Sequence, residues 1–200
     1  ANTRTKAANF TTPVFEALSR LRGGSMSKWQ TIYEDMIANA NRESDRGCSL
    51  ILSANLDNRL RDLLESYFVA QSSEKLNSIF QGNGCLSTFS SRIAISFSVG
   101  LLGNDERHDL DIIRAIRNDF AHNERSIDFF SSRVSDRCNS LRLYQNMIAD
   151  RQDIDCSRHS SRDKFQIVSV SLCLILEDRT RGAAENKRAV PGSRSILPKS

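Results

Sequence analysis

Apolar residues recur at three- and four-residue spacing through most of the chain, which is the spacing of amphipathic helices. The clearest case runs from Cys48 to Phe68, where apolar side chains fill one arc of a helical wheel. Ser44 and Asp45 are suitable caps for the start of this helix. The same spacing predicts further helices over residues 12–21, 28–40, 73–80, 87–102, 104–122, 133–148 and 164–178.

One of these segments has an ambiguous pattern, because the apolar residues of 164–178 alternate as they would in a strand. We favour a helix, since no other long strand is available to pair with it. Residues 126–130 could form a brief extended segment, and the polar residues 149–162 predict a loop. The pattern as a whole predicts an all-α fold, a compact single-domain bundle of about six to eight helices.

The composition agrees with one folded domain flanked by extensions. The chain has 200 residues, of which 39% are hydrophobic and 26% charged, enough for a single core. We expect an N-terminal extension with a peripheral helix over residues 1–25, a helical domain over 26–178, and a basic, disordered tail over 179–200. The longest charge-free apolar run, Phe165 to Leu176, is shorter than the roughly 20 residues that span a bilayer, so no membrane segment is expected.

Charge is distributed unevenly along the chain. The formal net charge is +4, but residues 26–178 hold 18 cations and 22 anions, so the excess of cations lies in the two ends. An acidic body is poorly suited to following a phosphate backbone. Any attraction to nucleic acid would therefore come from the basic ends and would be weak, salt-sensitive and independent of sequence.

The cysteines indicate reduced thiols in the cytoplasm. They are odd in number, and none forms a Cys-x-x-Cys pair: Cys48, Cys85, Cys138, Cys156 and Cys173. Cys156 and His159 have the spacing of metal ligands, but no second pair completes a tetrahedral site. Phosphate-binding, dinucleotide-binding and zinc-protease motifs are also absent from the sequence. We therefore expect no metal and no cofactor.

One arginine falls among apolar residues of the predicted helix 104–122. On a wheel of about 100° per residue, Arg117 lies inside the apolar arc, where an unpaired guanidinium would cost several kcal/mol, on the order of 3–5. Asp57 occupies the equivalent place on the long helix that begins near Cys48. The sequence thus predicts a structural ion pair between Asp57 and Arg117, buried between two core helices.

Polar residues follow that arginine to the end of the same helix. Asn118, Asp119 and His122 could satisfy the last carbonyl groups and hold the next loop. Alternatively, Arg117 could stabilise charge on a phosphate while His122 moves a proton, which would suffice to cleave RNA without a metal. Both interpretations remain open from the residues alone.

Residues 44–141 resemble the mannitol operon repressor family. Four blocks follow its pattern in order: SDRGCSLILSANLDNRLRDLL, FQGNGCLSTFSSRIAISFSVGLL, DLDIIRAIRNDFAH and DRCNSL. The resemblance implies a compact all-helical domain and a bacterial regulatory role in the uptake and use of sugar alcohols. We find no helix-turn-helix, zinc-finger or zipper pattern, so sequence-specific DNA binding is doubtful and regulation would act through protein partners of the sugar-uptake system.

A second, local resemblance covers six residues. The segment RNDFAH, from Arg117 to His122, is similar to the R-x4-H signature of HEPN-type helical proteins, a superfamily that includes metal-independent ribonucleases. In those enzymes the arginine and histidine are typically contributed across a homodimer. The resemblance implies an alternative function as an endoribonuclease, in which Asn118 and Asp119 would orient Arg117 and His122. A burial of Arg117 on Asp57 would argue against it.

A polar cluster before the predicted helix 87–102 is a candidate anion site. Ser87, Thr88 and Arg92 follow a glycine-rich stretch, and free backbone N–H groups at a helix start can bind an anion. The simpler alternative is capping of the helix by Ser87 or Thr88.

Our leading hypothesis is a cytoplasmic regulator of the mannitol repressor type. Such a protein would act by binding other proteins, and it could form a homodimer.

Overall fold

The computed structural model describes residues 26–122, 127–149 and 159–192, and it is all-α within them. The described residues form eight helices: α2 Met26–Arg42, α3 Asp45–Tyr67, α4 Ser73–Phe80, α5 Phe89–Ser98, α6 Asn104–His122, α7 Ser132–Asn139, α8 Arg142–Ala149 and α9 Ser161–Glu185. The all-α prediction is therefore confirmed. The peripheral helix expected over residues 12–21 lies outside the described residues.

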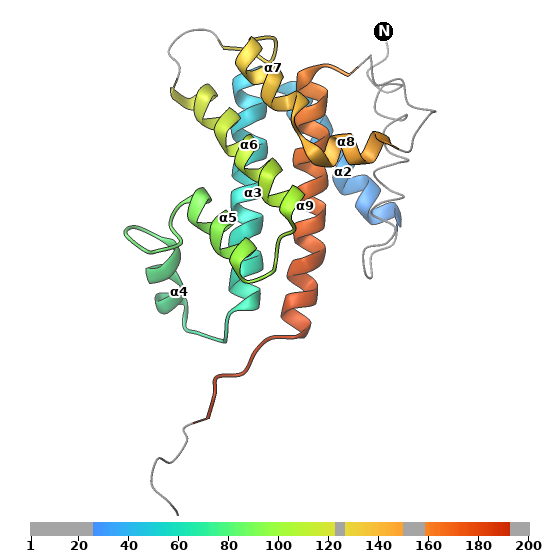
Figure 1. Ribbon diagram of the computed structural model, residues 1–200. Coiled ribbons are helices and arrows are strands. Elements are labelled where there is room, and N and C mark those ends of the chain that lie inside the picture. The colour runs from blue at the N-terminus through green and yellow to red at the C-terminus, as the bar shows by residue number, and fades with distance from the viewer. Residues whose placement is uncertain (1–25, 123–126, 150–158, 193–200) are drawn as a thin grey trace, which may run out of the picture.

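The two longest helices, α3 and α9, lie side by side at the centre (Figure 1). Three contacts join them in one register: Arg162 with Asp45, Gln166 with Cys48 at 3.5 Å, and Glu177 with Arg59. In each contact the residue of α9 lies 117 or 118 positions after its partner. A constant separation means that both helices run in the same direction, and Figure 1 shows both running from top to bottom.

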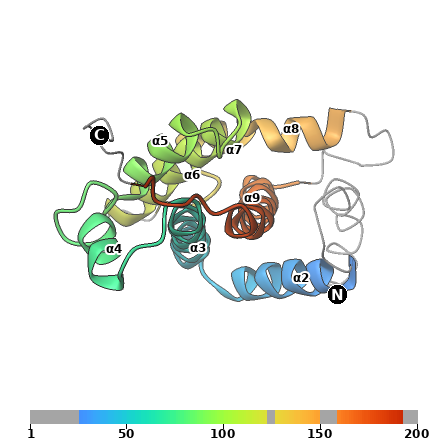
Figure 2. The same ribbon diagram turned by 90° about the horizontal axis from the view of Figure 1, so that it is seen from below.

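The other helices cover the two sides of this pair. Seen along α3 and α9, helices α5 to α8 form a layer on one side and α2 lies on the other (Figure 2). The buried core draws on every layer, with Trp29 and Tyr33 from α2, Leu56 and Leu60 from α3, Ile113, Ile116 and Phe120 from α6, and Val134 and Cys138 from α7.

Burial on all sides explains the ambiguous pattern of α9. Every residue from Phe165 to Leu174 is buried, whereas a surface helix buries only one stripe. The helix starts at a capping box in which Ser160 and Asp163 bond each other's backbone N–H groups. It also continues past residue 178, where we expected the tail. Arg179 holds this extension by donating to both carboxylate oxygens of Glu106 and to the carbonyl of Leu101.

Three other boundaries differ from the prediction. Helix α5 ends at Ser98 because Gly100 turns the chain with a φ of 78°, a conformation that favours glycine. The predicted helix 133–148 is two helices, α7 and α8, separated at residues 140–141. Residues 127–130, expected to be extended, contain no strand and instead form a turn before α7.

A buried carboxylate causes the break between α7 and α8. Asp109 of α6 is fully buried and accepts hydrogen bonds from the backbone N–H groups of Arg142 at 2.9 Å and Leu143 at 2.8 Å. These are first-turn N–H groups of α8, which have no partner within their own helix. Asp109 therefore caps α8 from another helix, and burial raises its pKa.

We predict that Asp109→Ala lowers the free energy of unfolding by about 1–3 kcal/mol, because it leaves two N–H groups without an acceptor. Urea denaturation followed by circular dichroism measures the change. Asp111→Ala is the matched control, since Asp111 lies on the same helix with a side chain 43% exposed and contacts only arginines at 3.5 Å or more. An equal loss in both variants would contradict the capping role.

Candidate functional site

Arg117 is exposed on α6, and its predicted ion pair with Asp57 is not formed. Its Nη1 donates to the side-chain oxygen of the neighbouring Asn118 at 3.0 Å. The position lies at the edge of the buried arc, from which a long side chain can extend its guanidinium into water. The prediction of a buried Arg117 was therefore wrong. Arg117 acts on Asp57 only through a longer-range electrostatic attraction, which lowers the pKa of the Asp57 carboxyl.

Asp57 is paired instead with Arg92 of α5. The Nη1 of Arg92 lies 2.7 Å from Oδ1 of Asp57, and only 7% of the arginine is exposed. Its other nitrogens donate to the carbonyls of Leu86, at 2.8 Å, and Phe80, at 3.2 Å. One guanidinium thus joins α3, the end of α4 and the loop before α5. Burial raises the pKa of Asp57, against the opposing effect of the Arg92 charge.

These contacts occupy the candidate anion site at the start of α5. Thr88 caps the helix, since its hydroxyl accepts the N–H of Ser91 at 3.1 Å while its own N–H donates to the hydroxyl of Ser91 at 3.3 Å. Ser87 is held in a turn through its N–H and the carbonyl of Gly84 at 3.0 Å. Because Arg92 donates inward to protein acceptors, Ser87, Thr88 and Arg92 do not converge on an open anion site.

The last turns of α6 divide into an inner and an outer side. Asp119 is 8% exposed and forms ion pairs with two arginines of α7, Arg137 and Arg133, the latter at 3.3 Å. His122 is exposed at the end of the helix. Arg117 and His122 are five residues apart, about 140° around the helix, so they point in different directions. Asp119 therefore ties α6 to α7 and does not orient Arg117 and His122.

Asp45 is another polar residue whose role the sequence analysis missed. It accepts the backbone N–H of Phe129 at 3.0 Å and pairs with Arg162 at the start of α9. Phe129 itself packs between Phe120 and Phe165, with ring centroids 5.1 and 5.3 Å apart. The cap of α3 expected at this point is Ser44, whose hydroxyl accepts the N–H of Gly47 at 3.1 Å, whereas the partners of Asp45 lie 84 and 117 residues further along the chain.

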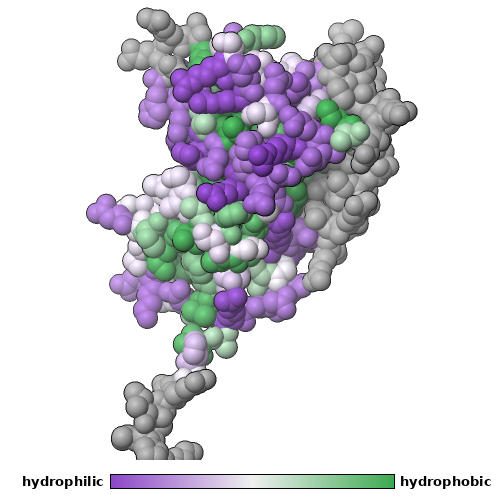
Figure 3. Space-filling model, viewed as in Figure 1, coloured by the Kyte–Doolittle hydropathy of each residue, from purple (hydrophilic) through white to green (hydrophobic). Residues whose placement is uncertain are grey.

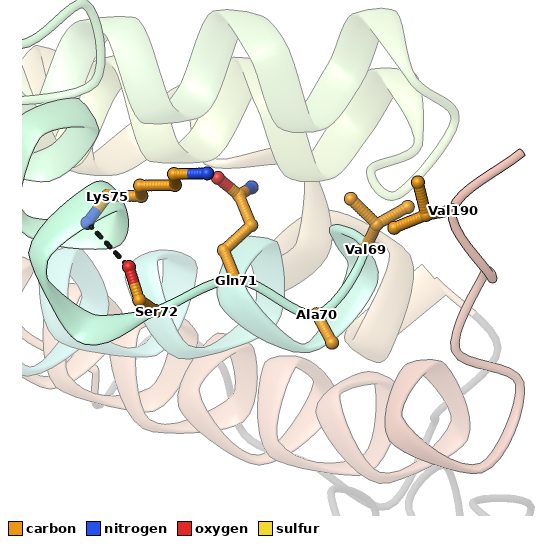
Figure 4. Close-up of a pocket in the computed structure, with 6 residues that line it drawn as sticks. All are labelled: Val69, Ala70, Gln71, Ser72, Lys75 and Val190. Atoms are coloured by element: carbon orange, nitrogen blue, oxygen red, sulfur yellow. Dashed lines mark hydrogen bonds between the residues drawn. The ribbon is translucent and has the colours of Figure 1, made fainter. Parts of the chain in front are cut away.

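An open pocket of about 600 Å³ lies at the opposite end of the molecule, beside the end of α3 (Figure 4). It is lined by Val69, Ala70, Gln71, Ser72, Lys75 and Val190. Figure 4 shows Val69 and Val190 close together at one end, with Lys75 at the other. Lys75 is its single charged side chain, and no carboxylate, histidine or cysteine is among its lining residues.

The described residues lack both a metal-binding cluster and a membrane-spanning helix. They contain no group of three histidine, cysteine or acidic side chains that could hold a metal ion. Within the same part of the chain, no helix is both long and apolar enough to cross a membrane.

Comparisons with known proteins define the class of fold. No family model matches the chain, and no curated protein matches it by sequence. Among solved structures, a similar chain aligns with 75% of this chain and with 99% of its own length, at a TM-score of 0.54 and 15% identity. At 15% sequence identity, this likeness shows a similar fold.

That chain comes from the X-ray structure of the MtlR–HPr complex of Escherichia coli, in which MtlR is the mannitol operon repressor. The sequence resemblance based on four ordered blocks is therefore matched by a likeness in three dimensions. The match supports a fold of the mannitol operon repressor type.

We predict that a double-mutant cycle for Asp57→Ala and Arg92→Ala gives a coupling of about 1–3 kcal/mol, because the two charges meet in a largely buried contact. The cycle for Asp57→Ala and Arg117→Ala is the control, and its coupling should stay below about 0.5 kcal/mol, since Arg117 is exposed. Unfolding free energies from urea titration supply all the terms. A larger coupling of Asp57 to Arg117 than to Arg92 would contradict the observed pair and support the one predicted from the sequence.

Proposed function

We propose that this protein is a bacterial regulator of the mannitol operon repressor type, which acts by binding a protein of the sugar-uptake system. The observation that carries the proposal is the fold likeness to a chain of the MtlR–HPr complex, which extends over 99% of that chain. An alignment over nearly the whole of that chain supports a counterpart of its fold here. HPr is accordingly the first partner to test.

The ion pairs of the body support protein contact over DNA contact. Many arginines that could reach phosphates are bound to acids of the same chain: Arg59 to Glu177, Arg137 to Asp119, Arg162 to Asp45 and Arg179 to Glu106. Each pair removes a free positive charge from a surface that is already acidic in sum. Strong binding to DNA requires several unpaired cations along one face.

We predict that HPr from the source organism, titrated into the full chain in a calorimeter, binds saturably at a 1:1 ratio, with a Kd in roughly the micromolar range of transient contacts. HPr from Escherichia coli is a second probe. An unrelated protein of the same mass and charge as HPr should give no saturable heat. The absence of binding at about 100 µM HPr would count against the proposal.

A second candidate function draws on the exposure of Arg117. The sequence argument against a HEPN-type ribonuclease was that Arg117 would be buried, and both Arg117 and His122 are exposed on α6. Their divergent directions on one helix would require a second copy to complete a site. The engagement of Asp119 with Arg133 and Arg137 removes one of the residues expected to assist.

We predict that purified protein leaves single-stranded RNA intact in EDTA, because Arg117 and His122 do not face one point within the chain. Denaturing gel electrophoresis over several hours, at protein in excess of RNA, measures the outcome. Cleavage that disappears in both Arg117→Ala and His122→Ala would establish the ribonuclease instead. Arg107→Ala, which removes another exposed arginine of α6, separates loss of that site from loss of charge.

A further inference from the structure

Helix α5 presents an exposed face without charge. We define the α5 face as Ser90, Ala94, Ile95, Ser98 and Val99, all of them exposed, with Ile95 and Val99 each at 37%. Between Gln81 and Asn104 the only charged residue is Arg92, and it is buried on Asp57. In Figure 3 a pale and green area covers the region of α5, with purple, hydrophilic residues above and below it.

This absence of charge is unusual for the molecule. Charged residues make up 26% of the chain, and the other described helices carry charged side chains on their solvent-facing surfaces. On α6, next to α5, Arg107 and Asp111 have side chains 46% and 43% exposed. Depletion of charge over a patch with exposed aliphatic side chains is characteristic of the core of a protein interface.

We propose that the α5 face is where a second copy of this chain docks, with the α5 helices of the two copies packed against each other across a two-fold axis. In such an interface a side chain near the axis meets its own copy, so a charge there would face its like. The α5 face carries no charge, so two copies can meet there without bringing like charges together. Ala94 and Ser98, one turn apart, are small enough for two helices to approach closely, while Ile95 and Val99 supply apolar area beside them.

Charge also favours a second copy over a foreign partner. A foreign protein attracted by opposite charge would bind most strongly to the charged surfaces of the acidic body. The α5 face carries no charge that such a protein could recognise. Two copies of an acidic body, by contrast, approach most easily where neither is charged. At the edge of the face, Arg107 stacks over Phe97 at 4.4 Å and lies 4.0 Å from Asp111, so the rim offers both signs for pairing.

The size of the face sets the expected strength. The α5 face has five residues, and even with the loop before α5 there are only eleven exposed residues from Gln81 to Gly100, fewer than the roughly 20–30 residues per side of a standard interface. The dimer should therefore be weak and depend on protein concentration. This proposal is independent of HPr binding, which is measured separately.

Sedimentation equilibrium of the full chain tests the proposal. We expect the apparent mass to rise with concentration from 22.5 kDa towards twice that value. Ile95→Asp should weaken association by roughly a hundredfold or more, because each copy would bring an unpaired carboxylate into the apolar part of the interface. Ile51→Asp is the matched control, since Ile51 is an equally exposed isoleucine, 41%, on α3, and it should leave association unchanged. Circular dichroism confirms that both variants are folded.

A cross-link locates the axis independently. In a background with Cys85→Ser and Cys156→Ser, we expect Ala94→Cys to form a disulfide-linked dimer on mild oxidation, and Ile51→Cys to form none. A monomer up to about 100 µM, equal association of wild type and Ile95→Asp, or equal loss in Ile51→Asp would each overturn the proposal. So would a monomeric wild type in which Ile95→Asp abolishes HPr binding, since the face would then serve a foreign partner.

Discussion

The parallel pairing of α3 with α9 is the constraint on which the rest of the structure depends. The register is fixed at one end by Arg162 on Asp45 and further along by Glu177 on Arg59. Once these helices lie together, α9 has to be covered on every side, because its apolar and small residues leave no polar stripe from Phe165 to Leu174. Helices α2, α6, α7 and α8 provide that cover, and α5 is added through α3 and α6. Helix α4 is joined to α3 by the small apolar cluster of Leu64, Phe80 and Leu86.

Buried carboxylates then join the outer helices to one another. The half-buried Asp57 holds α5 through the buried Arg92, while the buried Asp109 and Asp119 start α8 and bind α7. Removing a charge from water is unfavourable unless the charge gains partners, so each of these acids specifies a particular neighbour. They therefore fix the relative positions of helices whose apolar faces alone would tolerate several arrangements.

The sequence predicted the helices well and their polar connections poorly, for a physical reason. Periodicity depends on neighbours within one helix, so α3, α6 and the class of fold followed from it. Which acid meets which arginine depends on residues many positions apart. Arg117 was predicted to pair with Asp57 because a wheel does not separate the edge of an apolar arc from its centre. Asp109 could have been found, since on a wheel of about 100° per residue it lies inside the apolar arc, between Ile116 and Phe120.

The register of α3 and α9 also has a consequence for how the chain acquires its structure. Partners about 118 residues apart cannot meet until most of the protein has left the ribosome. Until then, the side of α3 that α9 will cover stays in contact with water or with other molecules. Such distant pairing slows folding, because the entropy of closing a long loop is lost before any stabilising contact forms. The nascent chain thus offers a chaperone an apolar surface that the mature protein no longer exposes.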